Sequence, residues 1–212
     1  MKKNIASLLA ILLLCGMAGL TACTEPTDAS PPPALEEVYD RLVTLIEASG
    51  EVNVLLFGEG LPTYPRGDAE DILTHRYFGA DENGLLSVTP YAKFRSIVEM
   101  QTAISAVYSV AYRESLFESL FTGYTGVTST VMPARYHEDD VALYQNVYVE
   151  PLVTEERVYD YAGMEIIEEE STSTYLRVSI PSYTESHPHE WKRVTLSFVY
   201  ENGDWYLDSP SC

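Results

Sequence analysis

The sequence predicts an α+β fold in which N-terminal helices pack on a curved, cone-like meander of antiparallel strands. Three segments between Leu35 and Phe121 carry apolar residues three and four positions apart, the period of a helix with one buried face. After Gly123, apolar and polar residues alternate, which is the period of a half-buried strand. Helices followed by a run of strands favour an α+β domain over repeated β-α-β units.

The first helix is expected to begin after Ala34. Glu36 and Glu37 fall in its first turn, where the helix dipole stabilises negative charge. Gly50 interrupts the pattern, and F-G-E-G-L-P at residues 57–62 ends it, because two glycines and a proline do not extend a helix. The apolar stripe consists of Leu35, Val38, Leu42, Leu45, Ile46, Val52, Leu55, Leu56 and Phe57.

Two shorter helices are expected after an irregular segment at residues 63–91. Ser96 and Glu99 have capping-box spacing, in which the serine oxygen and the glutamate carboxylate each accept from an N–H that the helix start leaves unpaired. Ser109 opens the second helix and Gly123 closes it. The two stripes are Ile97, Met100, Ile104 and Val107, and then Tyr112, Leu116, Phe117, Leu120 and Phe121.

Five strands are expected, at residues 142–149, 157–168, 172–182, 190–201 and 204–208. Asn202-Gly203 predicts a type I′ hairpin between the last two, because both residues tolerate positive φ. We expect one antiparallel sheet with an apolar face on the helices and a wet face. In the strand at 172–182, the apolar face is expected to carry Leu176, Val178 and Ile180, and the wet face Tyr175, Arg177 and Ser179. In the strand at 190–201, the apolar face is expected to carry Val194, Leu196, Phe198 and Tyr200, and the wet face Arg193, Thr195 and Ser197.

Residues 1–22 are predicted to be a secretion signal. Lys2 and Lys3 precede an apolar segment that is short for a membrane span and ends in small residues. The sequence Leu20-Thr21-Ala22-Cys23 resembles the lipobox of bacterial lipoproteins. The resemblance implies that Cys23 becomes the mature N-terminus with a diacylglycerol on its sulfur. The protein would then be anchored in the bacterial cell membrane, facing the extracytoplasmic side. A chance cysteine after an ordinary signal peptide is the alternative.

Residues 23–34 are predicted to be a lipidated cysteine and a flexible, proline-rich tether, followed by a single domain at residues 35–212. Pro31, Pro32 and Pro33 stand among threonine, serine and acids, with no large apolar group to pack. Because Cys15 leaves with the leader and Cys23 carries lipid, Cys212 has no partner for an intramolecular disulfide. It is expected to be a solvated residue or, alternatively, a reactive thiol.

The charge of the exported chain excludes nucleic acid as a partner. Two of the 13 Lys and Arg lie in the leader, so the remaining 11 stand against 32 Asp and Glu, a formal charge of −21. Such a field repels phosphate backbones and anionic headgroups. The lipid, rather than surface charge, is therefore expected to bring the protein to the membrane. We expect no cofactor, because no nucleotide-binding loop occurs. No G-x-S-x-G motif for a serine nucleophile occurs either.

The order of elements and the closing F-V-Y-E-N-G-D-W-Y-L-D-S at residues 198–209 resemble the nuclear transport factor 2-like or cystatin-like cone of exported lipoproteins, over about residues 92–208. The resemblance implies a curved sheet wrapped around a helical layer, with an interior or a sheet face that holds a ligand. Tyrosine is also a good strand residue whose ring packs while its hydroxyl stays wet. The ligand-binding candidates are Tyr144, Tyr159, Tyr161, Tyr175, Arg177 and Tyr200.

Histidine and acidic clusters give weaker candidates for metal binding. His187, His189 and Glu190 offer two imidazoles and a carboxylate, completed by His137 or Glu138, although an exposed, proline-stiffened hairpin loop fits the same residues. The H-E-D-D sequence at 137–140 has carboxylates for calcium but lacks the spacing of a calcium loop, which favours a solvated acidic turn. Residues 168–170 are three glutamates at a predicted strand end, where neighbours point to opposite faces.

Two hypotheses of function follow from the sequence. The first is an envelope-anchored, non-catalytic domain that binds a small ligand, a peptide or an envelope protein. The second is a metal-dependent or cone-interior enzyme that uses the loop of His187, His189 and Glu190. The sequence favours the first because no catalytic motif is recognisable in it.

Overall fold

The computed structural model describes residues 30–56, 58–64, 84–125, 131–149 and 157–211. The chain divides into two units, residues 1–30 and 31–212, and the described fold belongs to the second. The predicted leader, Cys23 and Cys212 lie outside the described residues. Within the described residues, no helix combines the length and apolar character that crossing a membrane requires.

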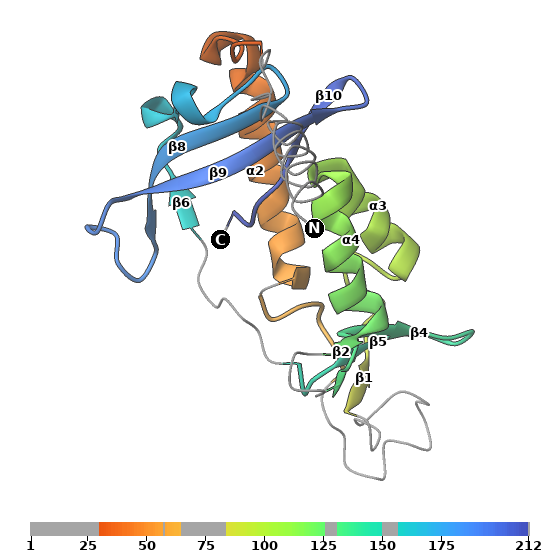
Figure 1. The fold of residues 1–212 in the computed structure, drawn as a ribbon. Helices are drawn as coiled ribbons and strands as arrows, with labels where there is room; N and C mark the ends of the chain where they lie inside the picture. Colours follow the sequence, from red (N-terminus) through yellow and green to blue (C-terminus); the bar gives the residue numbers. More distant parts are fainter. Residues whose placement is uncertain (1–29, 57, 65–83, 126–130, 150–156, 212) are drawn as a thin grey trace, which may run out of the picture. The chain divides into compact units, whose positions relative to one another are not determined.

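The fold is α+β, as predicted, with helices packed on a curved antiparallel sheet (Figure 1). The helices of the described residues are α2 (Leu35–Leu56), α3 (Ile97–Val107) and α4 (Val110–Phe117), followed by the π-helical turn η3 (Glu118–Thr122). The strands are β1 (Leu85–Ser87), β2 (Tyr124–Thr125), β3 (Val131–Met132), β4 (Tyr136–Glu138), β5 (Leu143–Asn146), β6 (Arg157–Tyr159), β7 (Glu165–Ile166), β8 (Tyr175–Thr184), β9 (Lys192–Glu201) and β10 (Asp204–Leu207).

Helix α2 is one continuous helix that runs through Gly50. The predicted stripe forms its buried face, except that Leu35 is half-buried and Phe57 lies outside the described residues, and Leu42, Leu45 and Leu55 are almost fully inaccessible. It packs against α3 and β10, and its apolar residues share one core with the inner residues of β8 and β9. The helix ends at Leu56, where Gly58 and Gly60 donate to helix carbonyls. The predicted stop is therefore confirmed.

The caps of α3 and α4 confirm the predicted starts and correct one detail. Ser96 Oγ accepts from the Glu99 N–H at 3.1 Å, as expected of a capping box. The Glu99 carboxylate, however, accepts from the Arg95 N–H at 2.8 Å, one residue earlier than predicted. Glu138 of β4 adds a third bond by accepting from the Ile97 N–H at 2.8 Å. Ser109 Oγ accepts from Tyr112 N–H at 3.1 Å and starts α4.

The prediction of a single sheet is wrong. β10, β9, β8 and β6 form a five-stranded antiparallel sheet together with β7, which pairs with β8. The predicted strand at 142–149 is β5, which lies in a separate sheet of order β1-β5-β4. β1 also corrects the expectation that residues 63–91 are irregular throughout. Its three residues are too few to show a period of two, and pairing with β5 makes them a strand.

Pro181 explains why the predicted strand at 157–168 is split. The segment forms β6, a 3₁₀ turn at Tyr161–Gly163, and β7. The Pro181 carbonyl accepts from Asp160 N–H at 2.9 Å, so its nitrogen also faces this segment. Because proline has no N–H to donate, the ladder breaks opposite it. Gly163 occupies the gap, where an added Cβ would lie 2.6 Å from Pro181 Cγ.

The faces of β8 and β9 follow the predicted alternation except at two positions. Leu176, Val178, Ile180, Leu196 and Phe198 are buried on the inner face. Tyr200, predicted on the same face, is 42% exposed because it lies at the hairpin end beyond the core. Ser197, predicted on the wet face, is buried, since its N–H donates to Ser209 Oγ of the following segment. Asn202 and Gly203 have φ of 55° and 88°, as the predicted type I′ turn requires.

The junction of α3 and α4 joins the helices to the edge of the five-stranded sheet. Tyr108 forms a parallel bridge with Leu207, and the Ser109 N–H donates to the Leu207 carbonyl at 2.9 Å. Ser109 Oγ bonds the Asp208 carboxylate, and the Val110 N–H donates to the Glu201 carboxylate at 2.7 Å. The β10 edge is thus covered by backbone, and carboxylates lie at the start of α4, where the helix dipole stabilises them.

A buried polar cluster holds the end of α2. Arg135 is only 3% exposed, and its guanidinium donates to the carbonyls of Leu56 and Gly58. A positive charge is stabilised there because the C-terminal end of a helix dipole is negative. The Gln145 side chain donates to the Glu59 carbonyl at 2.8 Å and accepts from the Leu61 N–H at 2.7 Å. These bonds fix residues 58–61 against β5 and the residue that precedes β4. The turn is held by side chains from strands far along the chain.

Replacing Gly60 by alanine should destabilise the domain more than replacing Gly203. Both glycines have positive φ, 85° and 88°, so alanine costs about 1–2 kcal/mol at either position. At Gly60 the new Cβ would lie 2.2 Å from Gln145 Oε1, whereas at Gly203 it would meet nothing within 4 Å. Displacing Gln145 removes two bonds worth about 1 kcal/mol each. Urea unfolding followed by tryptophan fluorescence should show this difference, and equal losses would contradict the role of Gln145.

Tyr136 should make stability fall at alkaline pH. It is fully buried, and burial raises its pKa from 10.0 to about 12, against a lowering contribution from Arg135. The folded protein then keeps a proton that the unfolded chain loses. The unfolding free energy should fall by about 1.4 kcal/mol per pH unit between pH 10 and 12. Tyr136→Phe should remove this component, and Tyr91→Phe, at a side chain 93% exposed, should not. Identical urea-unfolding profiles of the two variants over this range would contradict the assignment.

Candidate functional site

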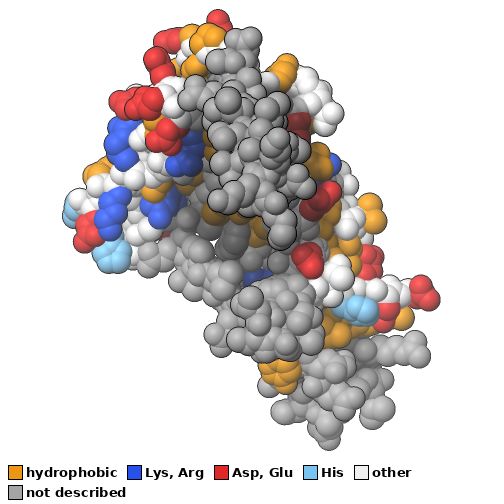
Figure 2. Space-filling view, in the orientation of Figure 1, with side chains coloured by type: hydrophobic (Ala, Val, Ile, Leu, Met, Phe, Trp, Pro, Cys, Tyr) orange, Lys and Arg blue, Asp and Glu red, His pale blue; other side chains and the backbone are white. Residues whose placement is uncertain are grey.

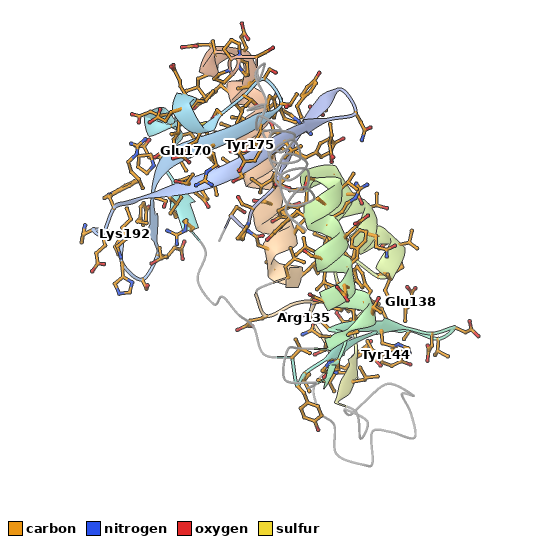
Figure 3. All side chains as sticks on the ribbon, in the orientation of Figure 1. Arg135, Glu138, Tyr144, Glu170, Tyr175 and Lys192 are labelled. Carbon is orange, nitrogen blue, oxygen red and sulfur yellow. The ribbon has the colours of Figure 1, made fainter. Side chains whose placement is uncertain are left out.

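The six predicted ligand-binding residues lie in four separate places. Tyr144 lies on β5 of the three-stranded sheet, where its hydroxyl donates to Asp139 at 3.3 Å and its ring is 6.3 Å from His137. In Figure 3 it is far from Tyr175, which lies on the five-stranded sheet. Tyr200 packs on Trp205 at the β9–β10 hairpin, with ring centroids 5.2 Å apart. These residues do not form one site.

Tyr159 and Tyr161 lie on the helix-facing side of the five-stranded sheet. Their rings stack, with centroids 6.3 Å apart and an interplanar angle of 22°. The Tyr159 hydroxyl donates to the Ser211 carbonyl at 2.5 Å. Burial raises the pKa of Tyr161, with smaller contributions from Glu47 and Tyr39. Both tyrosines therefore pack against the domain's own residues.

Tyr175 and Arg177 share the outer face of β8, the face turned away from the helices. Tyr175 donates to Ser197 Oγ at 3.2 Å across the strand pair. The Arg177 guanidinium lies 3.5 Å from the Glu170 carboxylate, an ion pair in which Arg177 Nε makes no hydrogen bond. Both side chains are partly exposed. The sequence thus placed these two residues correctly on one face.

The register of β8 and β9 extends this face toward the β8–β9 turn. Arg193 pairs with Pro181, and its guanidinium bonds Ser179 Oγ at 2.8 Å and the Glu165 carboxylate at 2.8 Å. Further along, the rings of Tyr183 and Trp191 meet edge to face, with centroids 4.7 Å apart. Trp191 is 53% exposed. We call the residues Tyr175, Arg177, Arg193, Tyr183 and Trp191 the outer row.

The outer row lies in the part of this acidic chain where basic side chains gather, and its own two arginines are paired with carboxylates. Arg157, Arg177, Lys192 and Arg193 lie on β6, β8 and β9, and Figure 2 shows Lys and Arg side chains gathered over this region. The whole chain has a formal charge of −19. Two tyrosines, two arginines and an exposed tryptophan in one row combine ring faces with guanidinium groups. Rings offer apolar faces and guanidinium groups offer paired donors for carboxylates, so the row has the chemical groups to contact ligands that carry both kinds of feature.

The predicted metal ligands are not brought together. His187, His189 and Glu190 are exposed in the β8–β9 turn, where His187 Nδ1 lies 2.6 Å from Ser186 Oγ. His137 and Glu138 lie on β4 of the other sheet, and Glu138 caps α3. Among the described residues, no three His, Cys, Asp or Glu side chains are placed to hold a metal ion. No observation therefore supports the metal-dependent alternative.

The two acidic segments contain residues that make hydrogen bonds or ion pairs within the domain. Asp139 begins the turn between β4 and β5, and hydrogen bonds from the backbone N–H groups of Ala142 and Val141 hold its pKa below the usual value. The expected acidic turn leads into β5 at Leu143. Residues 168–170 form a 3₁₀ turn, rather than a strand end, and Glu170 reaches Arg177 from it.

A cleft of about 510 Å³ lies beside β7. It is lined by Pro31, Pro32 and Pro33 on one side and by Met164, Glu165 and Ile166 on the other. Glu165 also pairs with Arg193, so the cleft adjoins the outer row. The prolines of the predicted tether thus lie against the five-stranded sheet.

No protein-family model and no curated protein sequence matches this chain.

Arg193, Tyr183 and Trp191 were not among the sequence-predicted ligand residues. The sequence alone does not show that these residues share a face with Tyr175 and Arg177. To see it, one must know which residues of β8 and β9 pair with each other. The exposed Trp191 directly after H-P-H-E is the signal that would have pointed to them.

Proposed function

We propose that this chain is a bacterial lipoprotein, anchored through lipid on Cys23 and facing the extracytoplasmic side. Its α+β domain is a non-catalytic binding module that engages an extended, anionic ligand of the cell envelope. The observation that carries the binding role is the outer row, which combines aromatic rings and arginines on one face of an acidic domain. The lipobox-like Leu20–Cys23 supports the location.

The length of the outer row favours an extended ligand. Tyr175 and Tyr183 are eight residues apart on one strand, which is about 27 Å at about 3.3–3.4 Å per residue. The row is also open, because its arginine side chains are 37% and 43% exposed. A chain of sugar rings or peptide units with carboxylates would place successive groups on the aromatic and guanidinium sites.

The two ion pairs on this face do not oppose such binding. Glu170 and Glu165 are 51% and 70% exposed, and pairs of this kind contribute at most about 1 kcal/mol. A ligand carboxylate that makes two parallel bonds to a guanidinium is worth more, because charge-assisted bidentate bonds are the stronger kind. Ligand binding would therefore exchange Glu170 for a ligand group at Arg177.

Arg177→Ala should weaken binding of soluble peptidoglycan fragments about tenfold, because it removes a charged hydrogen-bonding group worth about 1.4 kcal/mol. Glu170→Gln should strengthen binding, since it removes the competing carboxylate. Arg95→Ala is the matched control, because Arg95 is an exposed arginine away from the sheet. Amide chemical-shift titrations provide both affinity and location. Shifts confined to residues outside β8 and β9, or none at all, would contradict the proposal.

Cys23→Ser should release the protein from the membrane fraction and abolish palmitate labelling in a bacterial host. Two or three acyl chains hold a protein stably at a bilayer, whereas an unmodified chain of this charge is repelled by anionic headgroups. Mass spectrometry of the N-terminal peptide of the wild-type protein checks the modification directly. An unmodified thiol at Cys23, or a retained leader, would refute the lipoprotein assignment. A binding module could still stand in that case, so the two parts of the proposal fail separately.

A further inference from the structure

The segment that follows β10 occupies a polar cradle on the helix-facing side of the sheet. Ser211 is only 5% exposed, although it belongs to no helix or strand. Its hydroxyl bonds Ser49 Oγ at 2.5 Å and Asn53 Nδ2 at 2.9 Å, both on α2. Its carbonyl accepts from the Tyr159 hydroxyl of β6 at 2.5 Å. We call residues 209–211 the strap.

The hydrogen bonds around Ser211 form a chain in which the donor and the acceptor of each bond can be assigned. Ser49 donates to the Ile46 carbonyl at 2.6 Å, so it accepts from Ser211. Ser211 in turn accepts from the Asn53 amide, whose oxygen accepts from the Tyr108 hydroxyl at 2.8 Å. The Ser49 and Ser211 hydroxyls thus each have a defined donor and acceptor role. The cradle presents one acceptor, Ser49 Oγ, and two donors, Asn53 and Tyr159, to whatever lies in the place of Ser211.

The walls of the cradle are buried or half-buried, and they come from α2, β6 and the α3–α4 junction. Ser49 and Tyr108 are fully buried, and Ser49 and Asn53 break the apolar stripe of α2 at positions four residues apart. Buried polar groups cost about 1–3 kcal/mol each when they are left without partners. The cradle is therefore costly to leave empty, and it favours an occupant that matches its donors and acceptor.

The strap itself is weakly attached. Pro210, the residue between its two serines, is exposed, and no strap side chain contributes to the apolar core. Among the described residues, the polar bonds that attach it are those to Ser211 and the bond from Ser197 N–H to Ser209 Oγ at 3.0 Å. At about 1 kcal/mol per bond, its release costs a few kcal/mol, well below the 5–15 kcal/mol of global unfolding.

We propose that the cradle of Ser49, Asn53, Tyr108 and Tyr159 is a peptide-binding site that the strap occupies in cis. Its external ligand is an extended peptide whose serine or threonine hydroxyl and carbonyl replace those of Ser211. The site is distinct from the outer row, which lies on the opposite face of the sheet. The strap keeps the site closed, and a peptide of higher affinity displaces it.

The test compares the full chain with a variant that lacks residues 209–212, both purified in mild detergent. The probe is the end-blocked peptide Leu-Asp-Ser-Pro-Ser, the sequence of residues 207–211. The deletion variant should bind it at least tenfold more tightly than the full chain does, as measured by calorimetry. The peptide with alanine in place of its last serine should lose at least fivefold in affinity.

Side-chain variants in the deletion background locate the site. Tyr159→Phe should weaken peptide binding about fivefold or more, because it removes the donor to the serine carbonyl. Tyr161→Phe is the matched control, because Tyr161 stacks on Tyr159 but makes no hydrogen bond to the strap. A cooperatively unfolding deletion variant that does not bind the peptide, or equal effects of the two variants, would overturn the proposal.

Hydrogen exchange tests the strap in the intact chain, whether or not the deletion variant folds. The Ser197 N–H is protected by Ser209, whereas Leu196 lies in the β8–β9 ladder opposite Val178. A displaceable strap should let the Ser197 amide exchange at least tenfold faster than the Leu196 amide, with little dependence on urea. If both amides exchange only through global unfolding, the strap is an integral part of the fold and the proposal is wrong.

Discussion

The backbone bonds between the α3–α4 junction and β10 are the constraint on which the architecture depends. Tyr108 and Ser109 extend the sheet past β10, so the helices are attached to its edge by the same kind of bond that joins its strands. The residues joined are about a hundred positions apart in the chain. This attachment commits α2, α3 and α4 to one side of the sheet. The outer face of β8 and β9 is left without a helical cover for the same reason.

The sequence predicts the helices well because their signals are local. Ser96 and Ser109 start α3 and α4 as expected, and Gly58 and Gly60 end α2. Gly50 does not break α2, because seven or more apolar side chains of that helix are buried and outweigh a propensity loss of about 1 kcal/mol. Local signals therefore succeed where burial reinforces them.

The sheets are less predictable because their pairing depends on distant residues. Pro181 of β8 splits the strand at 157–168, and within that segment only Gly163 hints at the break. By strand alternation Tyr200 belongs to the buried face, yet it is exposed because it lies beyond the core. Alternation along a strand does not show how far the helices cover it. The role of Ser211 depends on Ser49 and Tyr159, which no sequence pattern links to it. Of the candidate ligand residues, only Tyr175 and Arg177 share the outer face.

Electrostatics limits where an anionic ligand can approach this chain. At physiological ionic strength, charges beyond about 8–10 Å are largely screened, so the net charge of −19 matters less than the groups within that distance. At the outer row these groups include Arg177 and Arg193, which pair with Glu170 and Glu165. A carboxylate arriving there meets a locally neutral surface whose acids are exposed and displaceable.

The position of the prolines restricts the reach of the domain if Cys23 carries lipid. Pro31, Pro32 and Pro33 line the cleft beside β7, so only residues 24–30 separate the lipidated cysteine from the domain. Seven residues at about 3.3–3.6 Å each reach at most about 25 Å. Glu165 lines the same cleft and pairs with Arg193, which places the outer row next to the attachment point. A ligand of the outer row would therefore be found close to the membrane surface, because the domain cannot carry its binding face far from its own anchor.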